Sequence, residues 1–273
     1  FATIPIRPVA STGLAVFSDL ASATAALPAL VATGLATIEL MDSESLRAAQ
    51  LPSDAPRDIR ALDVSAQCAL LLEFQAATEQ ELSGLESSAA STFAALDVQT
   101  PLTMTRDPAE RDALWHVRKG LYTTVAGARP SGTTALLEDI VVPVAELRAV
   151  CEQLTDLFTR HGYERSVIFG HAKDGNIHFM LNERFGDDQD LDRYRRFTED
   201  MVELVLAHSG NLKAEHGTGR IMAPFVERQY GPELYEVMRR VKQLFDPEGI
   251  LNPGVLLTDD ADSYLHNLKT VPT

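Results

Sequence analysis

Short apolar segments alternate with helical patterns along most of the chain, and this alternation restricts the folds that it can adopt. Segments that predict strands lie at residues 14–20, 35–42, 68–76, 101–107, 135–143, 165–170 and 176–182. Helical patterns occupy residues 22–30, 43–50, 79–96, 108–126, 144–161, 190–209, 220–230 and 232–245. Strands that alternate with covering helices are typical of an α+β sandwich.

The segment FGHAKDGNIHFML, residues 169–181, places His171 and His178 on either side of Asp174-Gly175-Asn176. Glycine and turn-forming residues interrupt helices, so the segment predicts a β-hairpin and not one helical face. A short turn can then bring both imidazoles within reach of one ion. Taken alone, the segment favours a hairpin in which the two histidines are incidental.

The segment KAEHGTGR, residues 213–220, adds a carboxylate and a third imidazole in Glu215 and His216. A carboxylate and two imidazoles suit a divalent transition metal, zinc foremost, with an open coordination position for a substrate. Gly217 and Gly219 would let the backbone approach a ligand closely. An ordinary loop that leads into a helix explains the segment equally well.

Arg118 lies in LWHVRKG, inside the long predicted helix at 108–126. It can be a solvated charge paired with Glu110 or Asp112, or a guanidinium that binds a substrate carboxylate. The pair Glu138-Asp139 precedes the apolar run IVVP, and its local sequence fits an acid pair at a strand edge as well as a functional role.

The net charge of −15 argues against nucleic acid or an anionic membrane surface as a partner, because either would need a basic patch. Cys68 and Cys151 lie far apart and form no C-x-x-C motif, which argues against a disulfide scaffold and favours a reducing compartment. No apolar run reaches the length of a membrane-spanning helix.

Together, FGHAKDGNIH, KAEHGTGR and FDPEGILNPG resemble, in this order, the C-terminal half of FAD-linked oxidases of the vanillyl-alcohol-oxidase superfamily. This branch covers D-lactate dehydrogenases, glycolate oxidase and D-2-hydroxyglutarate dehydrogenase. LWHVRKG and ALLEDIVVP match in place and order as well. The chain is most similar to large bacterial FAD-linked dehydrogenases with a C-terminal iron–sulfur region. The resemblance implies a substrate (cap) domain at 1–257 and a linker at 258–273 toward that region.

The resemblance also implies a role for each matching residue. His171 and His178 take the positions of two histidine ligands of a divalent metal, zinc foremost and Mn or Fe as alternatives, and Glu215 takes the acidic ligand position. His216 matches the general base that accepts the hydroxyl proton as hydride passes to the flavin. Arg118 matches the arginine that binds the substrate carboxylate. The positions expected near the FAD are Asn176, Glu215, Gly217 and Asn252.

The implied function is the substrate-binding half of a flavin-dependent dehydrogenase that oxidises a D-2-hydroxy acid, such as D-lactate, glycolate or D-2-hydroxyglutarate. Met180 stands where the hydroxyglutarate enzymes have Asn, which weakens a specific assignment to that substrate. The chain contains neither the glycine-rich FAD-binding loop nor the cysteine-rich iron–sulfur motifs of the family. We therefore expect it to be inactive alone and to hold little or no flavin.

The expected architecture is a ferredoxin-like antiparallel sheet covered by helices on one side. The other side would face the FAD domain, and its exposed apolar surface could mediate a homodimer. We expect a cytoplasmic protein, with peripheral attachment to the inner membrane through an electron acceptor as an alternative. Two other functions stay open: a stand-alone metal-dependent hydrolase that uses the same His/His/Glu site, and a non-catalytic ligand-binding module.

Overall fold

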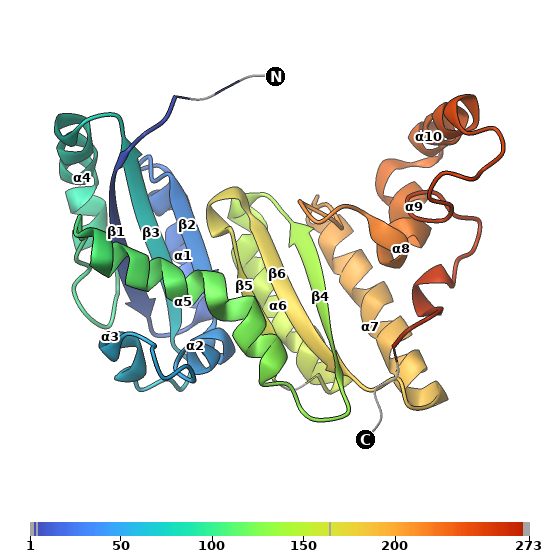
Figure 1. The fold of residues 1–273 in the computed structure, drawn as a ribbon, viewed down its shortest axis with the longest axis horizontal. Coiled ribbons are helices and arrows are strands. Elements are labelled where there is room, and N and C mark those ends of the chain that lie inside the picture. Colours follow the sequence, from blue (N-terminus) through green and yellow to red (C-terminus); the bar gives the residue numbers. More distant parts are fainter. Residues whose placement is uncertain (1–2, 4, 164, 270–273) are drawn as a thin grey trace.

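A six-stranded antiparallel sheet forms the centre of the molecule (Figure 1). The structure is a computed structural model, and it describes residues 3, 5–163 and 165–269. In their order across the sheet, the strands are β1 (Val9–Phe17), β3 (Cys68–Ala76), β2 (Thr37–Met41), β5 (Val167–Gly170), β6 (Asn176–Glu183) and β4 (Thr134–Val141). The expected α+β class, with an antiparallel sheet covered by helices, is confirmed.

Helices cover both faces of this sheet, whereas we expected them on one face. One face packs against α1 (Leu20–Val31), α4 (Glu79–Ala94), α6 (Leu147–His161) and α7 (Asp188–Ala207). The other face packs against α2 (Ser43–Ala49), α3 (Arg57–Arg60) and α5 (Pro108–Gly127). In β3, Leu70 and Leu72 point to the first face and Ala69 and Leu71 to the second. Burial on both sides explains why residues 68–72 of this strand are all apolar.

Two ion pairs, each with a buried carboxylate, attach α5 to the sheet. Arg111 and Arg118 are seven residues apart, which is close to two helical turns, so both point to the same side of the helix. Arg111 contacts Glu73 of β3 at 3.2 Å, and Arg118 contacts Glu39 of β2 at 2.8 Å. Asp107 caps the helix by accepting hydrogen bonds from the first free N–H groups, and Pro108 fits the first turn.

The helix predicted at residues 43–50 forms as α2, and Asp42 caps it, because its carboxylate accepts the N–H of Ser45 at 2.8 Å. The prediction of a strand at residues 101–107 was wrong. Residues 101–107 do not form a strand and make only an isolated bridge between Thr105 and Thr12. This segment lies over the face of β1 at Gly13, where an added Cβ would be 2.8 Å from the carbonyl oxygen of Thr103. The segment thus bulges over β1 between two isolated bridges to its edge, Thr12–Thr105 and Phe17–Val98, and forms no continuous pairing.

The C-terminal part forms an arm that stands away from the sheet (Figure 1). It contains α8 (Gly219–Met222), α9 (Val226–Tyr230) and α10 (Pro232–Phe245). The tail returns to the body through a 3-10 helix at Ser263–Leu265, where Tyr264 is buried beside Tyr194 and Phe225. At least this part of the expected linker at 258–273 packs on the domain, and residues 270–273 lie outside the described part of the chain.

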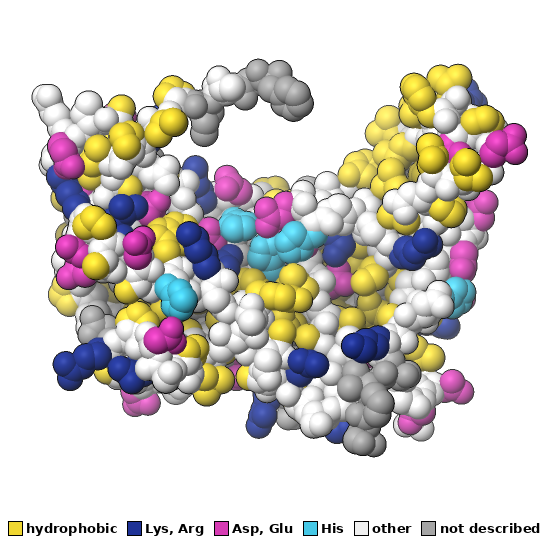
Figure 2. Space-filling model, in the orientation of Figure 1, with side chains coloured by type: hydrophobic (Ala, Val, Ile, Leu, Met, Phe, Trp, Pro, Cys, Tyr) yellow, Lys and Arg dark blue, Asp and Glu magenta, His cyan; other side chains and the backbone are white. Residues whose placement is uncertain are grey.

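The exposed apolar surface is on this arm and not on the sheet, which corrects our expectation. The exposed side chains on α10 and the loop after it are Leu234, Val237, Val241, Leu244, Phe245, Ile250, Leu251 and Leu256. The five on α10, up to Phe245, follow one another at helical spacing, so they form one stripe on the surface of the helix. Figure 2 shows apolar side chains gathered at this end of the molecule. Within the described residues, no helix is long and apolar enough to cross a membrane.

Candidate metal and substrate site

The predicted hairpin brings the two histidines together. His171 directly follows β5, and His178 lies in β6 opposite Phe169. A 3-10 turn at Ala172–Asp174 and Gly175, with φ of +73°, connect the strands. The two imidazole rings stand at 90° to one another with centroids 5.3 Å apart. The turn therefore places both rings on the same end of the sheet.

Glu215 lies between these two rings. One of its oxygens, Oε1, is 3.0 Å from Nε2 of His171 and 3.3 Å from Nε2 of His178. The three candidate ligand atoms lie within 4.8 Å of one another. Two imidazole nitrogens and a carboxylate oxygen that converge in this way fit a zinc-like ion with an open position. The structure thus brings together all three residues that the sequence predicted as ligands.

On its other nitrogen, each imidazole faces a buried carboxylate. Nδ1 of His171 is 2.8 Å from Oε1 of Glu39, and Nδ1 of His178 is 3.3 Å from Oδ1 of Asp139. Glu39 is 3% exposed and Asp139 is fully buried. The hydrogen bond with Glu39 raises the pKa of His171. Carboxylates at Nδ1 that leave Nε2 for a metal are a common feature of histidine metal sites.

Asp139 belongs to a second group of close ligand atoms, with His178 and His216, but its oxygens are already used. Oδ2 accepts the backbone N–H groups of residues 214, 215 and 216, and Oδ1 accepts the side-chain amide of Asn176. Burial opposes the charge of Asp139, and its hydrogen bonds outweigh burial and hold its pKa far below the ordinary value. Because this carboxylate serves as an internal acceptor, the His171–His178–Glu215 group is the better metal site.

His216, the predicted base, lies beside the candidate metal site. Its ring stacks on that of His178, with centroids 4.8 Å apart and an interplanar angle of 8°. Its side chain is 42% exposed, and Nε2 is 3.8 Å from Oε1 of Glu215. An imidazole in this position can reach a molecule bound at the three ligand atoms.

Arg118 pairs with neither Glu110 nor Asp112. Its Nε and Nη2 lie 2.9 and 2.8 Å from Oε2 of Glu39, and its guanidinium lies over the ring of Phe169. Glu39 therefore connects Arg118 with His171. A guanidinium has five N–H donors, so these two contacts leave donors for a substrate carboxylate. Glu39 was not among the predicted site residues, although an acid inside the otherwise apolar strand TIELM is a visible signal.

The four positions expected near FAD are not equivalent in the structure. Glu215 faces the open side of the site, and Gly217, with φ of +71°, has open space around it. Asn176 is buried and donates to Asp139 and to the carbonyl oxygen of Ile140. Asn252 lies on the arm, in an apolar depression that α10 lines with Val237, Val241 and Phe245. The structure thus groups the first three near the histidines and places Asn252 with the exposed apolar stripe.

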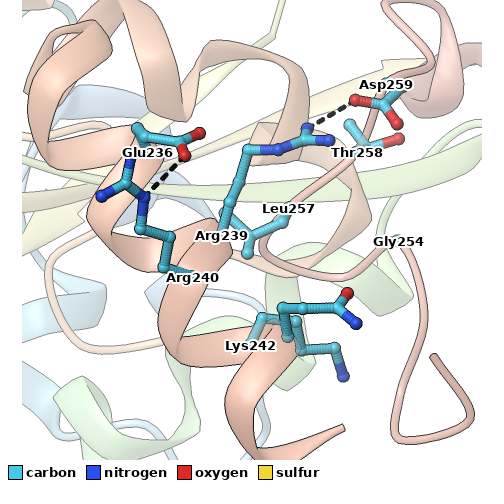
Figure 3. A pocket seen from close by; sticks show the side chains of 9 residues that line it. Glu236, Arg239, Arg240, Lys242, Gly254, Leu257, Thr258 and Asp259 are labelled. Carbon is cyan, nitrogen blue, oxygen red and sulfur yellow. Dashed lines mark hydrogen bonds and ion pairs between the residues drawn. The ribbon is translucent and has the colours of Figure 1, made fainter. Parts of the chain in front are cut away.

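The site opens on the concave side of the molecule. Figure 2 shows histidine side chains at the floor of the hollow between the sheet and the arm, with acidic and basic side chains beside them. A second depression on the arm is lined by Arg239, Arg240 and Lys242 (Figure 3). Their acidic partners are Asp259, Glu236 and Asp246. Since each cation is already paired, this depression is a weaker candidate for a ligand site.

Two known proteins are similar in sequence to at least two thirds of this chain. The chain is 27% identical over 264 residues to glycolate oxidase subunit GlcD of Bacillus subtilis, which covers 94% of the chain and 53% of the relative. It is 30% identical over 190 residues to D-2-hydroxyglutarate dehydrogenase of Stutzerimonas stutzeri, which covers 67% of the chain and 39% of that enzyme. The chain thus spans about half or less of these relatives.

Solved structures share the fold at low identity. The crystal structure of p-cresol methylhydroxylase with substrate bound gives a TM-score of 0.61 at 13% identity, over 92% of this chain and 53% of the other. The 4-ethylphenol oxidase of Gulosibacter chungangensis gives a TM-score of 0.60 at 13% identity, over 93% of this chain and 55% of the other. The sequence profile of the FAD linked oxidases, C-terminal domain, matches residues 6–256. The chain therefore belongs to the family of FAD linked oxidases, of which it carries the C-terminal domain.

Proposed function

We propose that this chain is the substrate-binding half of a flavin-dependent dehydrogenase that oxidises a D-2-hydroxy acid to the 2-oxo acid. The observation that carries the proposal is the convergence of His171, His178 and Glu215 beside Arg118 and His216. Its relatives include proteins named for glycolate, D-lactate and D-2-hydroxyglutarate. These three acids share a carboxylate next to a hydroxyl-bearing carbon, and the site offers a group for each of these two functions.

The residues divide the work in the following way. Arg118 binds the substrate carboxylate through the N–H groups that Glu39 leaves free, which fixes the hydroxyl carbon over the histidine pair. His171, His178 and Glu215 hold a divalent metal, zinc foremost. When bound, such a metal polarises the substrate hydroxyl as a Lewis acid.

His216 accepts the hydroxyl proton at a ring nitrogen, because a neutral imidazole is an effective base near neutral pH. Flavin, when bound, takes up the hydride, so the substrate loses one proton and one hydride and becomes the 2-oxo acid. We place the flavin-binding domain in the part of the relatives that this chain does not span. On this view, the chain alone holds little flavin and has no oxidase activity.

Metal analysis tests the ligand assignment directly. We expect about one zinc per chain in the wild type after zinc loading and desalting, and none in the double variant His171→Ala, His178→Ala. The matched control is His116→Ala, His266→Ala, which removes two imidazoles that lie on the exposed surface. Equal metal content in all three proteins would contradict the assignment, and preferential loading by Mn or Fe would change the metal but not the site.

Ligand binding tests the substrate class. Calorimetry with the zinc-loaded chain should detect D-lactate, glycolate or D-2-hydroxyglutarate and should show weaker binding for L-lactate. An equal response to propionate, which has the carboxylate but no hydroxyl, would argue against a site for hydroxy acids. Ester hydrolysis by the zinc-loaded chain without flavin would instead support a metal-dependent hydrolase.

A further inference from the structure

The buried carboxylate of Asp139 lies directly behind the candidate metal site. Its Oδ2 accepts three consecutive backbone N–H groups, from Ala214 at 2.9 Å, Glu215 at 2.8 Å and His216 at 2.9 Å. A carboxylate oxygen has two lone pairs, so three donors on one oxygen are unusual and depend on its negative charge. One side-chain atom thus holds the backbone of a metal ligand and of the base.

The loop that Asp139 holds has little other support. Residues 212–218 contain no helix or strand, and the loop joins the sheet by the isolated bridge between Asn211 and Val141. Lys213 adds one buried ion pair, with Glu138 at 2.6 Å. Glu215 and His216 are half exposed, and the contacts of their side chains are with the histidine rings of the site. The backbone from which both side chains project is therefore held largely by the three hydrogen bonds to Asp139.

The other oxygen of Asp139 faces His178. Oδ1 accepts the amide of Asn176 at 2.7 Å and lies 3.3 Å from Nδ1 of His178. That contact is long for a hydrogen bond, and Nδ1 has no hydrogen-bond partner among the residues that the structure describes. Oε1 of Glu215 lies at the same distance, 3.3 Å, from Nε2 of His178. Because Asp139 is fully buried and Glu215 is half exposed, Asp139 is the stronger acceptor and favours a proton on Nδ1. Nε2 is then left without a proton on the side that faces Glu215.

We infer that Asp139 is a positioning residue that holds the Glu215–His216 loop with one oxygen and sets the tautomer of His178 with the other. The inference rests on the proposed function, which gives Glu215, His216 and His178 their roles in binding a metal and accepting a proton. It explains why two segments that are far apart in the sequence meet in a defined geometry. Carboxylates that orient metal-binding histidines in this way typically change metal affinity 10–100-fold when they are mutated.

The variant Asp139→Asn tests the inference. The amide oxygen still faces the three backbone N–H groups, although it accepts them more weakly without the negative charge. The amide nitrogen then faces Nδ1 of His178 and the side-chain amide of Asn176 as a donor. We expect His178 to move its proton to Nε2, and zinc affinity to fall at least tenfold. The control Asp112→Asn makes the same chemical change on the exposed side of α5 and should alter neither property.

Two measurements on the 273-residue chain read out these effects. Nitrogen-15 NMR of labelled histidine gives the tautomer of His178 in the metal-free protein, and a zinc titration with a competing chelator gives the affinity. In the wild type we expect the proton on Nδ1, and slow hydrogen exchange for the amides of Glu215 and His216. A wild-type His178 protonated on Nε2, or a variant with unchanged tautomer and zinc affinity, would overturn the inference.

If Asp139→Asn does not fold, the His178 tautomer and the amide exchange of the wild type still test the inference. The same data separate this inference from the proposed function. A wild type that binds no zinc contradicts the proposed metal site, whereas its His178 tautomer and amide protection still decide the role of Asp139.

Discussion

Gly175, the residue that ends the turn between the two histidines, offers the most direct test of how the site is built. Its φ of +73° lies in the left-handed region, where a side chain is unfavourable. A Cβ at this position would be 1.9 Å from the carbonyl oxygen of Val142. The variant Gly175→Ala must therefore move the turn away from Val142 and shift His171 relative to His178.

The structure gives the size of this effect. The left-handed conformation costs alanine about 1–2 kcal/mol. The shift also lengthens or breaks the hydrogen bond from the Val142 N–H to the Gly175 oxygen, which is 3.1 Å long. The loss of a backbone hydrogen bond costs roughly another 1 kcal/mol. With the packing that moves alongside Val142, we expect Gly175→Ala to lower the free energy of unfolding by about 3–5 kcal/mol.

Gly162 is a matched control, because its φ is +70° and an added Cβ would meet no atom within 4 Å. Gly162→Ala should therefore cost only the conformational part, about 1–2 kcal/mol. Urea unfolding at neutral pH measures both variants, and a zinc titration well below the transition tests the site. Equal losses of stability in the two variants, or unchanged zinc affinity in a folded Gly175→Ala protein, would refute the reasoning.

Three further predictions concern other parts of the molecule. Burial opposes the charge of Glu73, but its hydrogen bonds outweigh burial and hold its pKa below the ordinary value. The charged Glu73 therefore contributes its full stabilisation above the unfolded-state pKa of about 4.3, and this stabilisation is lost as pH falls through the lower folded-state pKa. Urea unfolding should show that the stability of Glu73→Gln falls less steeply with pH than that of the wild type below about pH 5. Arg118→Lys keeps the charge but not the planar donors, and calorimetry should show roughly tenfold weaker binding of the hydroxy acid with little change in zinc affinity; unchanged affinity for the acid would remove Arg118 from substrate binding. Leu244→Ser, Phe245→Ser should change the free energy of unfolding by no more than about 0.5 kcal/mol, since both side chains are exposed, and light scattering should show less self-association than in the wild type.

The sequence predicted those helices and strands that are marked by neighbouring residues, such as a capping residue or an apolar run. Asp107 and Pro108 mark the start of α5, and the apolar residues 68–72 of β3 reflect burial on both faces. Local sequence does not predict where a helix or strand lies relative to the rest of the fold. The amphipathic pattern of α5 does not say which face of the sheet it covers. Residues 101–107 have a strand-like pattern, although they bulge over β1 at Gly13 between two isolated bridges.

The candidate site divides in the same way. His171, His178 and Glu215 lie in short motifs, and their chemistry made them candidates before their positions were known. Glu39 has no such motif, and it is 132 residues from His171 in sequence. It reaches this histidine only because β2 pairs with β5. Residues that orient a site from a neighbouring strand thus depend on strand order, which a single sequence does not reveal.

The exposure of each side chain in the site matches its proposed role. The orienting carboxylates Glu39 and Asp139 are buried, where low polarity strengthens their hydrogen bonds. Glu215 and His216, which would meet a metal and a substrate, are half exposed. Fixed charges stabilise a reacting group most strongly when water is excluded. In this site the ligand groups are in place, but water still reaches them. We therefore expect a hydroxy acid to bind the isolated chain weakly and in a salt-dependent manner. It should bind more tightly, and with less dependence on salt, once a flavin-binding domain covers the hollow; equal affinity and salt dependence in both forms would show that the site is complete without it.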